Sequence, residues 1–215
     1  MIKAIIFDYN GVVKAINKYF FDDVESIFSL SAEEKEYAKK MTRDLFEQLD
    51  KGLLNEDSFW LKFSQRINKS MPVNVKELAR KLFNEHFELY EEVVNMLKNL
   101  KTNGYVTAVL SDTFPYMADI TRERNGFDYF DKVYLSCEVG FVKPQKEFYE
   151  LAVKDLVVLP GECIFIDDNE DNLLPAEKLG MKTILAKKPD QIVKDVWEII
   201  KSENKILKVK LKQQF

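Results

Sequence analysis

Short runs of consecutive apolar residues recur along the chain and predict strands. The first run occupies residues 2–7, is rich in isoleucine and ends directly before Asp8. Comparable runs follow at residues 105–110, 132–135, 163–166 and 183–185. Runs with so few polar positions are typical of strands that are buried on both faces of a parallel sheet.

From residue 91 onward, the segments between these runs show the apolar spacing of helices. Helices are expected over residues 91–101, from Pro115 to near Gly126, after Pro144 to about Leu156, after Asp168 as far as Gly180, and over residues 189–201. Strands that alternate with helices indicate an α/β fold, here a Rossmann-like doubly wound parallel sheet. Residues 206–211 alternate apolar residues with lysine, which predicts either one more edge strand or a frayed end.

The stretch between the first two predicted strands shows helical spacing alone. Helices are expected over residues 20–28, from a capping box at Ser31 and Glu34 to about Asp50, after Asn55, and after Pro72 and Asn74. This stretch contains no catalytic cluster of its own. We therefore expect a small all-helical cap domain at residues 14–90, inserted into an α/β core domain that consists of residues 1–13 and 91–215.

Composition narrows the class of protein. The 32 basic residues are balanced by 36 acidic ones, for a net charge of −4, so we expect no nucleic-acid partner. We also expect no membrane span and no signal segment, because the apolar runs are too short. Cys137 and Cys163 lie in separate predicted strands without metal-site spacing, which favours reduced thiols in a cytoplasmic protein. His86, the only histidine, lies in a helical pattern and is interpreted as a surface or packing residue. The oligomeric state stays open.

Polar side chains follow three of the predicted strands. Asp8 follows the first, Ser111 and Asp112 the second, and Asp167 with Asp168 the fourth. Taken alone, Asp8 before an Asn-Gly pair would be an ordinary strand exit. The carboxyl ends of parallel strands, however, meet at one edge of a sheet, where ligands bind. We therefore expect the three groups to lie close together.

Acidic side chains gathered at this edge would repel one another without a cation. Mg²⁺ characteristically binds through one or two carboxylates, waters and a phosphate oxygen. Ser111 can donate a hydrogen bond to the same phosphate, and Lys143 can supply a positive charge. The ordered set therefore predicts phosphoryl transfer.

Four stretches of the chain resemble the motifs of the haloacid dehalogenase-like superfamily of hydrolases. They are residues 8–12, 110–112, 143–144 and 165–172. Residues 136–144, with 160–163 and the acid pair, are similar to the N-terminal phosphatase domain of soluble epoxide hydrolases and to related bacterial sugar-phosphate phosphatases. The helical insertion matches the small cap domain of that family. The resemblance covers essentially the whole chain.

The resemblance implies that Asp8 is the nucleophile and forms an aspartyl-phosphate intermediate. It also implies that Mg²⁺ is bound by Asp8, Asp168 and the backbone carbonyl of Asn10. Asp167 would act through water from a second layer around the metal, together with Asn172.

The phosphoryl group has its own implied partners. By the same resemblance, Ser111 and the backbone amide of Asp112 would hold the phosphoryl oxygens. Lys143 would neutralise both Asp8 and the phosphoryl group.

Asn10 departs from the family's phosphatase pattern, which places there an Asp that protonates the leaving oxygen. A side-chain amide cannot exchange a proton in this way at neutral pH. The resemblance thus implies a Mg²⁺-dependent phosphatase of small phosphorylated metabolites, impaired at position 10. Two alternatives stay open: a carbon–halogen hydrolase in which Asp8 attacks carbon without a metal, and a non-catalytic phosphate-binding homologue. The acid pair Asp167 and Asp168 favours the metal-dependent enzyme.

Overall fold

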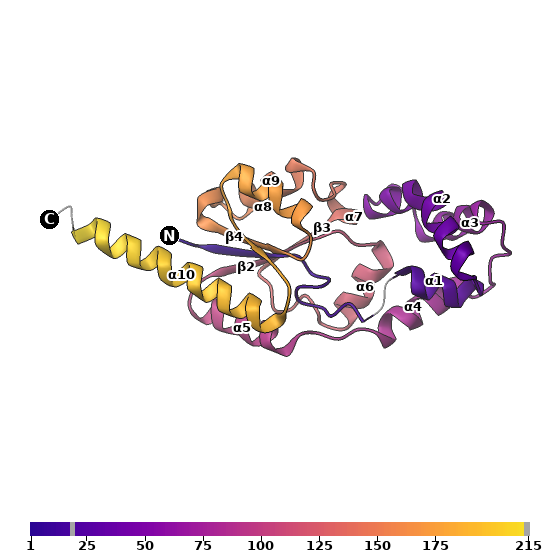
Figure 1. The fold of residues 1–215 in the computed structure, drawn as a ribbon, viewed down its shortest axis with the longest axis horizontal. Helices are drawn as coiled ribbons and strands as arrows, with labels where there is room; N and C mark the ends of the chain where they lie inside the picture. The colour runs from indigo at the N-terminus through magenta and orange to yellow at the C-terminus, as the bar shows by residue number, and fades with distance from the viewer. Residues whose placement is uncertain (18–19, 213–215) are drawn as a thin grey trace.

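The computed structural model describes residues 1–17 and 20–212 and contains a five-stranded parallel sheet (Figure 1). The strands are β1 (Ala4–Phe7), β2 (Val106–Ser111), β3 (Lys132–Leu135), β4 (Cys163–Asp167) and β5 (Lys182–Leu185). Their order is β3-β2-β1-β4-β5, so the first strand of the chain lies at the centre and pairs with both β2 and β4. The predicted α/β fold with a parallel sheet is confirmed.

Helices cover both faces of this sheet. Figure 1 shows α8 (Lys146–Asp155) and α9 (Glu170–Leu179) on one face, and α5 (Glu91–Thr102) and α10 (Pro189–Lys212) on the other. Side chains alternate along a strand, so β1 serves both layers. Its residues Ile5 and Phe7 join the cluster of α5 and α10, whereas Ala4 and Ile6 join that of α8 and α9. This two-sided burial accounts for the continuous apolar run of β1.

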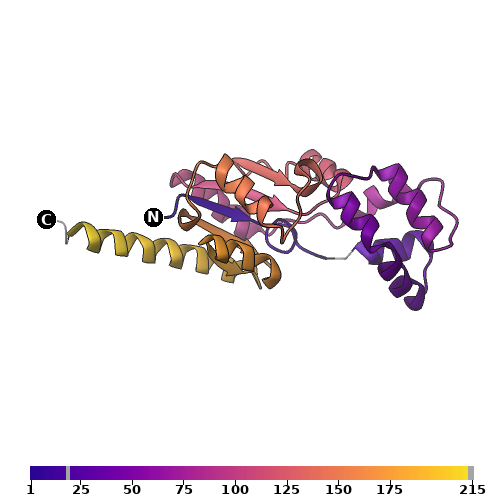
Figure 2. The ribbon, with the colours of Figure 1, turned by 90° about the horizontal axis from the view of Figure 1, so that it is seen from above.

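Four helices stand together beyond the carboxyl ends of the strands, as Figure 2 shows, and are referred to below as the helical cap. They are α1 (Phe20–Phe28), α2 (Ala32–Asp50), α3 (Glu56–Arg66) and α4 (Val75–Glu85). Ser31 and Glu34 form the predicted capping box of α2, and Asn55 caps α3. The four helices pack around an aromatic cluster that also includes Phe114 and Tyr116, at the start of α6 (Pro115–Glu123). The domain boundaries at 13 and 91 stay a prediction.

The two connections between the sheet and the helical cap run side by side. The Ala15 amide donates to the Glu88 carbonyl oxygen at 2.9 Å, and the Tyr90 amide donates to the Val13 carbonyl oxygen at 2.9 Å. Lys14 lies between these bonds, and its backbone forms bridges with both Asn10 and Leu89. The turn after β1 is therefore joined by hydrogen bonds to the segment that leaves the cap.

Two sequence predictions are wrong in detail. No edge strand forms at residues 206–211, because α10 continues through them to Lys212. The chain after Pro189 contains neither glycine nor proline, so helix propagation is not interrupted. Cys137 lies in the short helix α7 (Ser136–Val139) rather than in a strand, whereas Cys163 begins β4 after the 3₁₀ turn η1 (Pro160–Glu162); both thiols are free. None of the helices described is long and apolar enough to cross a bilayer.

Candidate active site

Asp8 extends the line of β1 into the turn that follows. Its amide donates to the Ile166 carbonyl oxygen at 2.8 Å, which continues the pairing of β1 with β4 past the last strand residue. The chain then curls back, since the amides of Val13 and Lys14 both donate to the Tyr9 carbonyl oxygen. Gly11 adopts φ +82°, in the left-handed region that favours glycine. A sharp turn thus follows directly behind the Asp8 carboxylate.

Lys143 lies between two carboxylates at the edge of the sheet. Its Nζ is 2.8 Å from Asp8 Oδ1 and 2.7 Å from Asp167 Oδ2. The side chains of Lys143 and Asp167 are 3% and 0% exposed, and that of Asp8 is 9% exposed. Burial raises the pKa of Asp8 to about 7, although the Lys143 ammonium acts in the opposite direction. Burial lowers the pKa of Lys143, but the charges of the neighbouring acids outweigh this and raise it above its ordinary value.

Both oxygens of Asp167 are engaged with protein donors. Oδ2 accepts from Lys143, whereas Oδ1 accepts from the Asn169 amide at 2.9 Å and from Asn172 Nδ2 at 3.0 Å. Asn172 is itself held because its carbonyl oxygen accepts a hydrogen bond from the Tyr149 hydroxyl. Asp168, by contrast, is exposed; partial desolvation of its carboxyl, together with the Asp167 charge, raises its pKa. The Asp167 carboxylate is therefore occupied by hydrogen bonds within the protein, whereas the Asp168 carboxylate is accessible from solvent.

The acidic group fits a hard divalent cation. Carboxylate oxygens of Asp8, Asp167 and Asp168 all lie within 4.8 Å of one another. Lys143 is the one ammonium bonded to this set among the described residues, so three acids face a single positive charge. Oxygen donors with surplus negative charge are the ligands that Mg²⁺ prefers. The donor set therefore suits the ion implied by the sequence.

The turn after β2 completes this edge. Ser111 is buried, and its hydroxyl donates to the Asp112 carbonyl oxygen at 3.3 Å. Asp112 Oδ1 accepts from the Lys143 amide at 3.0 Å, which connects this turn to the loop that carries Lys143. The Thr113 amide donates to Ser136 Oγ at 3.0 Å. Ser136 opens α7 and lies in the stretch 136–144 that carried the resemblance, but nothing in the sequence indicated a separate role for it.

A cavity of about 200 Å³ adjoins the same edge, between the strand ends and the helical cap. Asn10, Asp112, Lys14, Asp23 and His86 are among the residues that line it. The interpretation of His86 as only a surface or packing residue is therefore incomplete. Lys14 and Asp23 were missed because they belong to no motif. The sole signal for Lys14 was a charged residue directly after a pair of valines.

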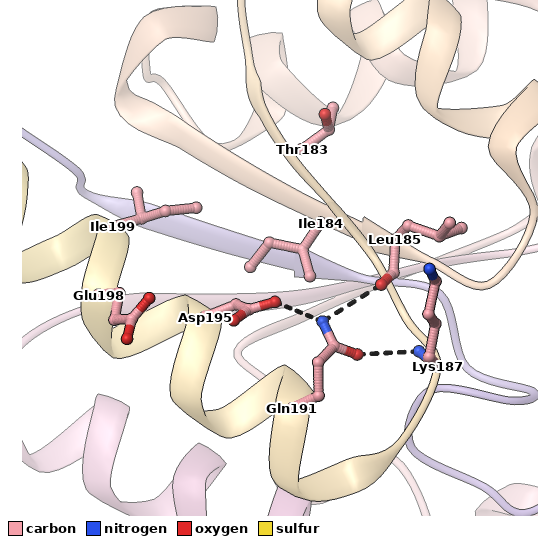
Figure 3. A pocket seen from close by; sticks show the side chains of 8 residues that line it. All are labelled: Thr183, Ile184, Leu185, Lys187, Gln191, Asp195, Glu198 and Ile199. Carbon is pink, nitrogen blue, oxygen red and sulfur yellow. Dashed lines mark hydrogen bonds between the residues drawn. The ribbon is translucent and has the colours of Figure 1, made fainter.

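A larger hollow, of about 440 Å³, lies elsewhere, beside β5 and the start of α10 (Figure 3). Gln191 is one of the residues that line it; its side chain donates to the Leu185 carbonyl oxygen and to Asp195 and accepts from the Lys187 amide. These bonds fasten the connection between strand and helix. None of the acids at the strand ends lines this hollow, so the edge around Asp8 is the candidate active site.

The chain is similar in sequence to known hydrolases. A sequence model of the family described as haloacid dehalogenase-like hydrolase matches residues 2–180. D-ribitol-5-phosphate phosphatase of Bacteroides thetaiotaomicron is 27% identical over 192 residues, which cover 85% of this chain and 91% of that protein. Sesquiterpene phosphatase astK of Aspergillus oryzae is 24% identical over 180 residues, which cover 83% of this chain and 87% of that protein.

Solved structures give the same picture of the fold. A haloacid dehalogenase family enzyme from Bacteroides thetaiotaomicron, in complex with magnesium and inorganic phosphate, superposes with a TM-score of 0.73 at 25% identity; the match covers 87% of this chain and 96% of that one. L-2-haloacid dehalogenase of Xanthobacter autotrophicus, with chloropropionic acid covalently bound, superposes with a TM-score of 0.60 at 19% identity and covers 85% and 76%. The second likeness concerns the fold alone.

Replacing Gly11 with Ala is expected to weaken Mg²⁺ binding. The new Cβ would lie 2.3 Å from Asp168 Oδ2, so the carboxylate must move. Gly104→Ala is a matched control, because Gly104 has φ +81° and its Cβ would meet no atom within 4 Å. Both variants should lose about 1–2 kcal/mol of stability to the left-handed backbone.

Isothermal titration and urea unfolding separate the two effects. Only Gly11→Ala should lose Mg²⁺ affinity, by about tenfold or more, the scale seen when a ligand's surroundings are disturbed. Equal Mg²⁺ affinity in the two variants would contradict the placement of Asp168 beside the metal.

Replacing Asp8 with Asn is expected to stabilise the metal-free protein above neutral pH. The pKa of Asp8 is raised to about 7, so the folded protein keeps a proton that the unfolded chain has released. Stability therefore falls as pH rises from about 4 to about 7, and stays low above that. Asn carries no charge and should remove this fall. A gain of 1 kcal/mol raises the Tm of a chain this size by about 2–4 °C.

The measurement is Tm against pH in the presence of a chelator. Asp57→Asn is the control, since Asp57 is exposed on the helical cap. A stability difference between Asp8→Asn and the unmodified protein that does not grow from about pH 5 to about pH 8 would overturn this account of Asp8.

Proposed function

The chain belongs to the haloacid dehalogenase-like hydrolase family, and on that premise we propose that it is a Mg²⁺-dependent phosphatase of small phosphorylated metabolites. The observation that carries the proposal is the contact of Lys143 with both Asp8 and Asp167, with Asp168 beside them. This edge brings together a candidate nucleophile, Asp8, the buried ammonium of Lys143, and more carboxylates than that one positive charge can neutralise. The phosphatases among the relatives and the magnesium–phosphate complex of one neighbour support it.

The metal would be held by the carboxylates of Asp8 and Asp168 and by the backbone carbonyl of Asn10. When bound, Mg²⁺ would offset the negative charge of Asp8 and of the phosphoryl oxygens. Asp167 would stay outside the ligand set, because Lys143, Asn169 and Asn172 already engage its oxygens.

The chemical step would begin with Asp8 as the nucleophile. A carboxylate oxygen of Asp8 attacks phosphorus, the bond to the alcohol oxygen breaks, and the phosphoryl group is transferred to Asp8. Lys143 favours the ionised, nucleophilic form of Asp8, which burial opposes. Water then hydrolyses the aspartyl phosphate and releases inorganic phosphate. Ser111 and the Asp112 amide would hold the phosphoryl oxygens throughout.

Asn10 limits the departure of the alcohol. Its amide can donate a hydrogen bond but cannot give up a proton at neutral pH. The leaving alkoxide must therefore take its proton from water, so esters of acidic alcohols should react fastest. Attack of Asp8 on a halogen-bearing carbon needs no metal, so it would give the paired acids Asp167 and Asp168 no role. The dehalogenase alternative is therefore the weaker one.

The direct test is a panel of phosphomonoesters, assayed with Mg²⁺ and with a chelator. Release of inorganic phosphate should require Mg²⁺ and should disappear in Asp8→Asn. Turnover that persists in the chelator, or halide release from a 2-haloacid, would refute the proposal.

Replacing Asn10 with Asp is expected to raise turnover of alkyl phosphates by about 10²–10⁴-fold, the usual contribution of general acid–base catalysis. The gain should be smaller for aryl phosphates, whose leaving groups need little protonation. Mg²⁺ affinity should change less than turnover, because the proposed ligand at position 10 is the backbone carbonyl. Parallel rates on both ester types decide the matter.

Asn125→Asp is a useful control, since Asn125 lies in the turn after α6 and belongs to none of the four motifs. If Asn10→Asp hydrolyses neither ester faster than the unmodified protein does, position 10 is not the position of a missing general acid.

A further inference from the structure

The turn between β2 and α6 carries the groups that are expected to hold the phosphoryl oxygens. It consists of residues 111–114 and is referred to below as the phosphoryl turn. Ser111 is the last residue of β2, and Pro115 is the first residue of α6. The turn lies in the predicted core domain, but its packing involves both the sheet and the helical cap.

The core holds the phosphoryl turn by hydrogen bonds from two other segments. Ser136 Oγ accepts from the Thr113 amide at 3.0 Å and donates to the Thr113 carbonyl oxygen at 3.4 Å. Asp112 Oδ1 accepts from the Lys143 amide. Ser136 and Thr113 are both buried, so water does not compete for the bonds between them. Such shielded hydrogen bonds fix the backbone on its core side.

The helical cap holds the other end of the phosphoryl turn through Phe114. This residue is buried and belongs to the aromatic cluster of the cap. The centre of its ring lies 5.5 Å from that of Phe20 in α1 and 5.7 Å from that of Phe46 in α2. Aromatic pairs at such distances attract each other beyond the area that they bury. A residue two positions after Asp112 is thus anchored to two helices of the cap.

The helix that follows the turn also lies against the cap. Figure 1 shows α6 near α4, and the two helices are in contact. Tyr116 belongs to the aromatic cluster, and Arg80 of α4 is 3.9 Å from Asp119 Oδ2. Arg124, directly after α6, donates to the Asn84 carbonyl oxygen at 3.3 Å. By packing, α6 is therefore attached to the cap, although the sequence places it in the core domain.

Phe114 stands at a position where a polar helix cap is usual. It is the N-cap residue of α6, and in the described part of the chain no side chain caps the helix there. Pro115 restricts Phe114 to extended backbone, which it adopts with φ −87° and ψ 153°. A displacement of the ring is therefore passed on to the preceding residues rather than absorbed at Phe114. Departures from a local rule are expected where a contact has another role.

The same short turn is thus held from opposite sides. We propose, resting on the phosphatase function in which the Asp112 amide holds a phosphoryl oxygen, that Phe114 and Ser136 are positioning residues for that amide. Ser136 holds the turn to the core and Phe114 holds it to the cap, so the packing of the cap sets how tightly the phosphoryl group is bound. Hydrogen bonds weaken steeply when the donor is displaced or misaligned, so a small shift of the turn is sufficient.

The first test compares two phenylalanines of one aromatic cluster. The probe is inorganic phosphate, titrated by calorimetry with Mg²⁺ present, because it has no alcohol part that could touch the Phe114 ring in the cavity. Phe114→Leu should weaken phosphate binding by about tenfold or more, the scale of a hydrogen bond to a charged group. Phe63→Leu is the matched control, since Phe63 is buried in the same cluster but lies in α3.

Both variants should lower the Tm to a similar extent. Mg²⁺ affinity without phosphate should stay unchanged in both, because none of the proposed metal ligands lies in the phosphoryl turn. Equal phosphate affinity in Phe114→Leu and Phe63→Leu would overturn the proposal.

The second test removes the hydroxyl on the core side. Ser136→Ala should also weaken phosphate binding by about tenfold or more. Ser64→Ala is the control, because Ser64 is buried in the cap and its hydroxyl donates to the Leu61 carbonyl oxygen at 2.9 Å. An unchanged phosphate affinity in Ser136→Ala would contradict its role.

The double variant of Phe114→Leu and Ser136→Ala tests whether both act on one turn. Its loss of phosphate affinity should be smaller than the product of the two single losses, because either change alone already releases the turn. A loss equal to the product would show that the two residues act independently, against the proposal.

Binding and hydrolysis together separate this inference from the proposed function. The expected order of phosphate affinities without hydrolysis of any phosphomonoester would refute the phosphatase function alone. Hydrolysis by the unmodified protein, with equal phosphate affinities in Phe114→Leu and Phe63→Leu, would refute the positioning role alone. Absence of phosphate binding in the unmodified protein would refute both.

Discussion

The contact of one buried ammonium with two buried carboxylates determines much of this structure. Lys143 is removed from water in contact with Asp8 and Asp167, and its positive charge lies between the two carboxylates. Three separate segments must therefore arrive at one point: the end of β1, the end of β4 and the loop before α8. The backbone amide of Lys143 adds a fourth, since it donates to Asp112 after β2.

The sheet order satisfies this requirement with short connections. β1 is central and is flanked by β2 and β4, so the three strands whose ends carry the acids are direct neighbours. β3 and β5 lie outside them and contribute packing rather than charge. The helical cap enters directly after β1, and this places its polar residues opposite the one strand that carries the proposed nucleophile.

The sequence could predict those features that depend on residues close together along the chain. The strands and the acids at their ends were predictable because each apolar run stops at a polar residue, and parallel strands align such stops. The capping box at Ser31 and the Asn55 cap were predictable for the same local reason. Residues 206–211 were expected to form an edge strand or a frayed end, because the alternation was considered over six residues alone, without the uninterrupted helix before them.

The cavity residues required knowledge of the fold. Lys14 and Asp23 are separated by nine positions, and His86 lies much later in the chain, directly after α4, so no spacing along the chain unites them. Only the pairing of the two connections brings their segments together. Asn10 was recognised as a departure, yet nothing in the chain order showed that a cavity with polar groups lies beside it.

That pairing of the connections also bears on how such a protein can diversify. Asp23 lies in α1 and His86 directly follows α4, and these helices pack on the aromatic cluster of the cap rather than on the sheet. Lys14 is different, because its backbone bridges the Asn10 turn and Leu89 at once. In duplicated copies of this chain, substitutions that alter the substrate would therefore accumulate first in the cap helices. At position 14 the side chain can be exchanged, but the backbone conformation must be kept.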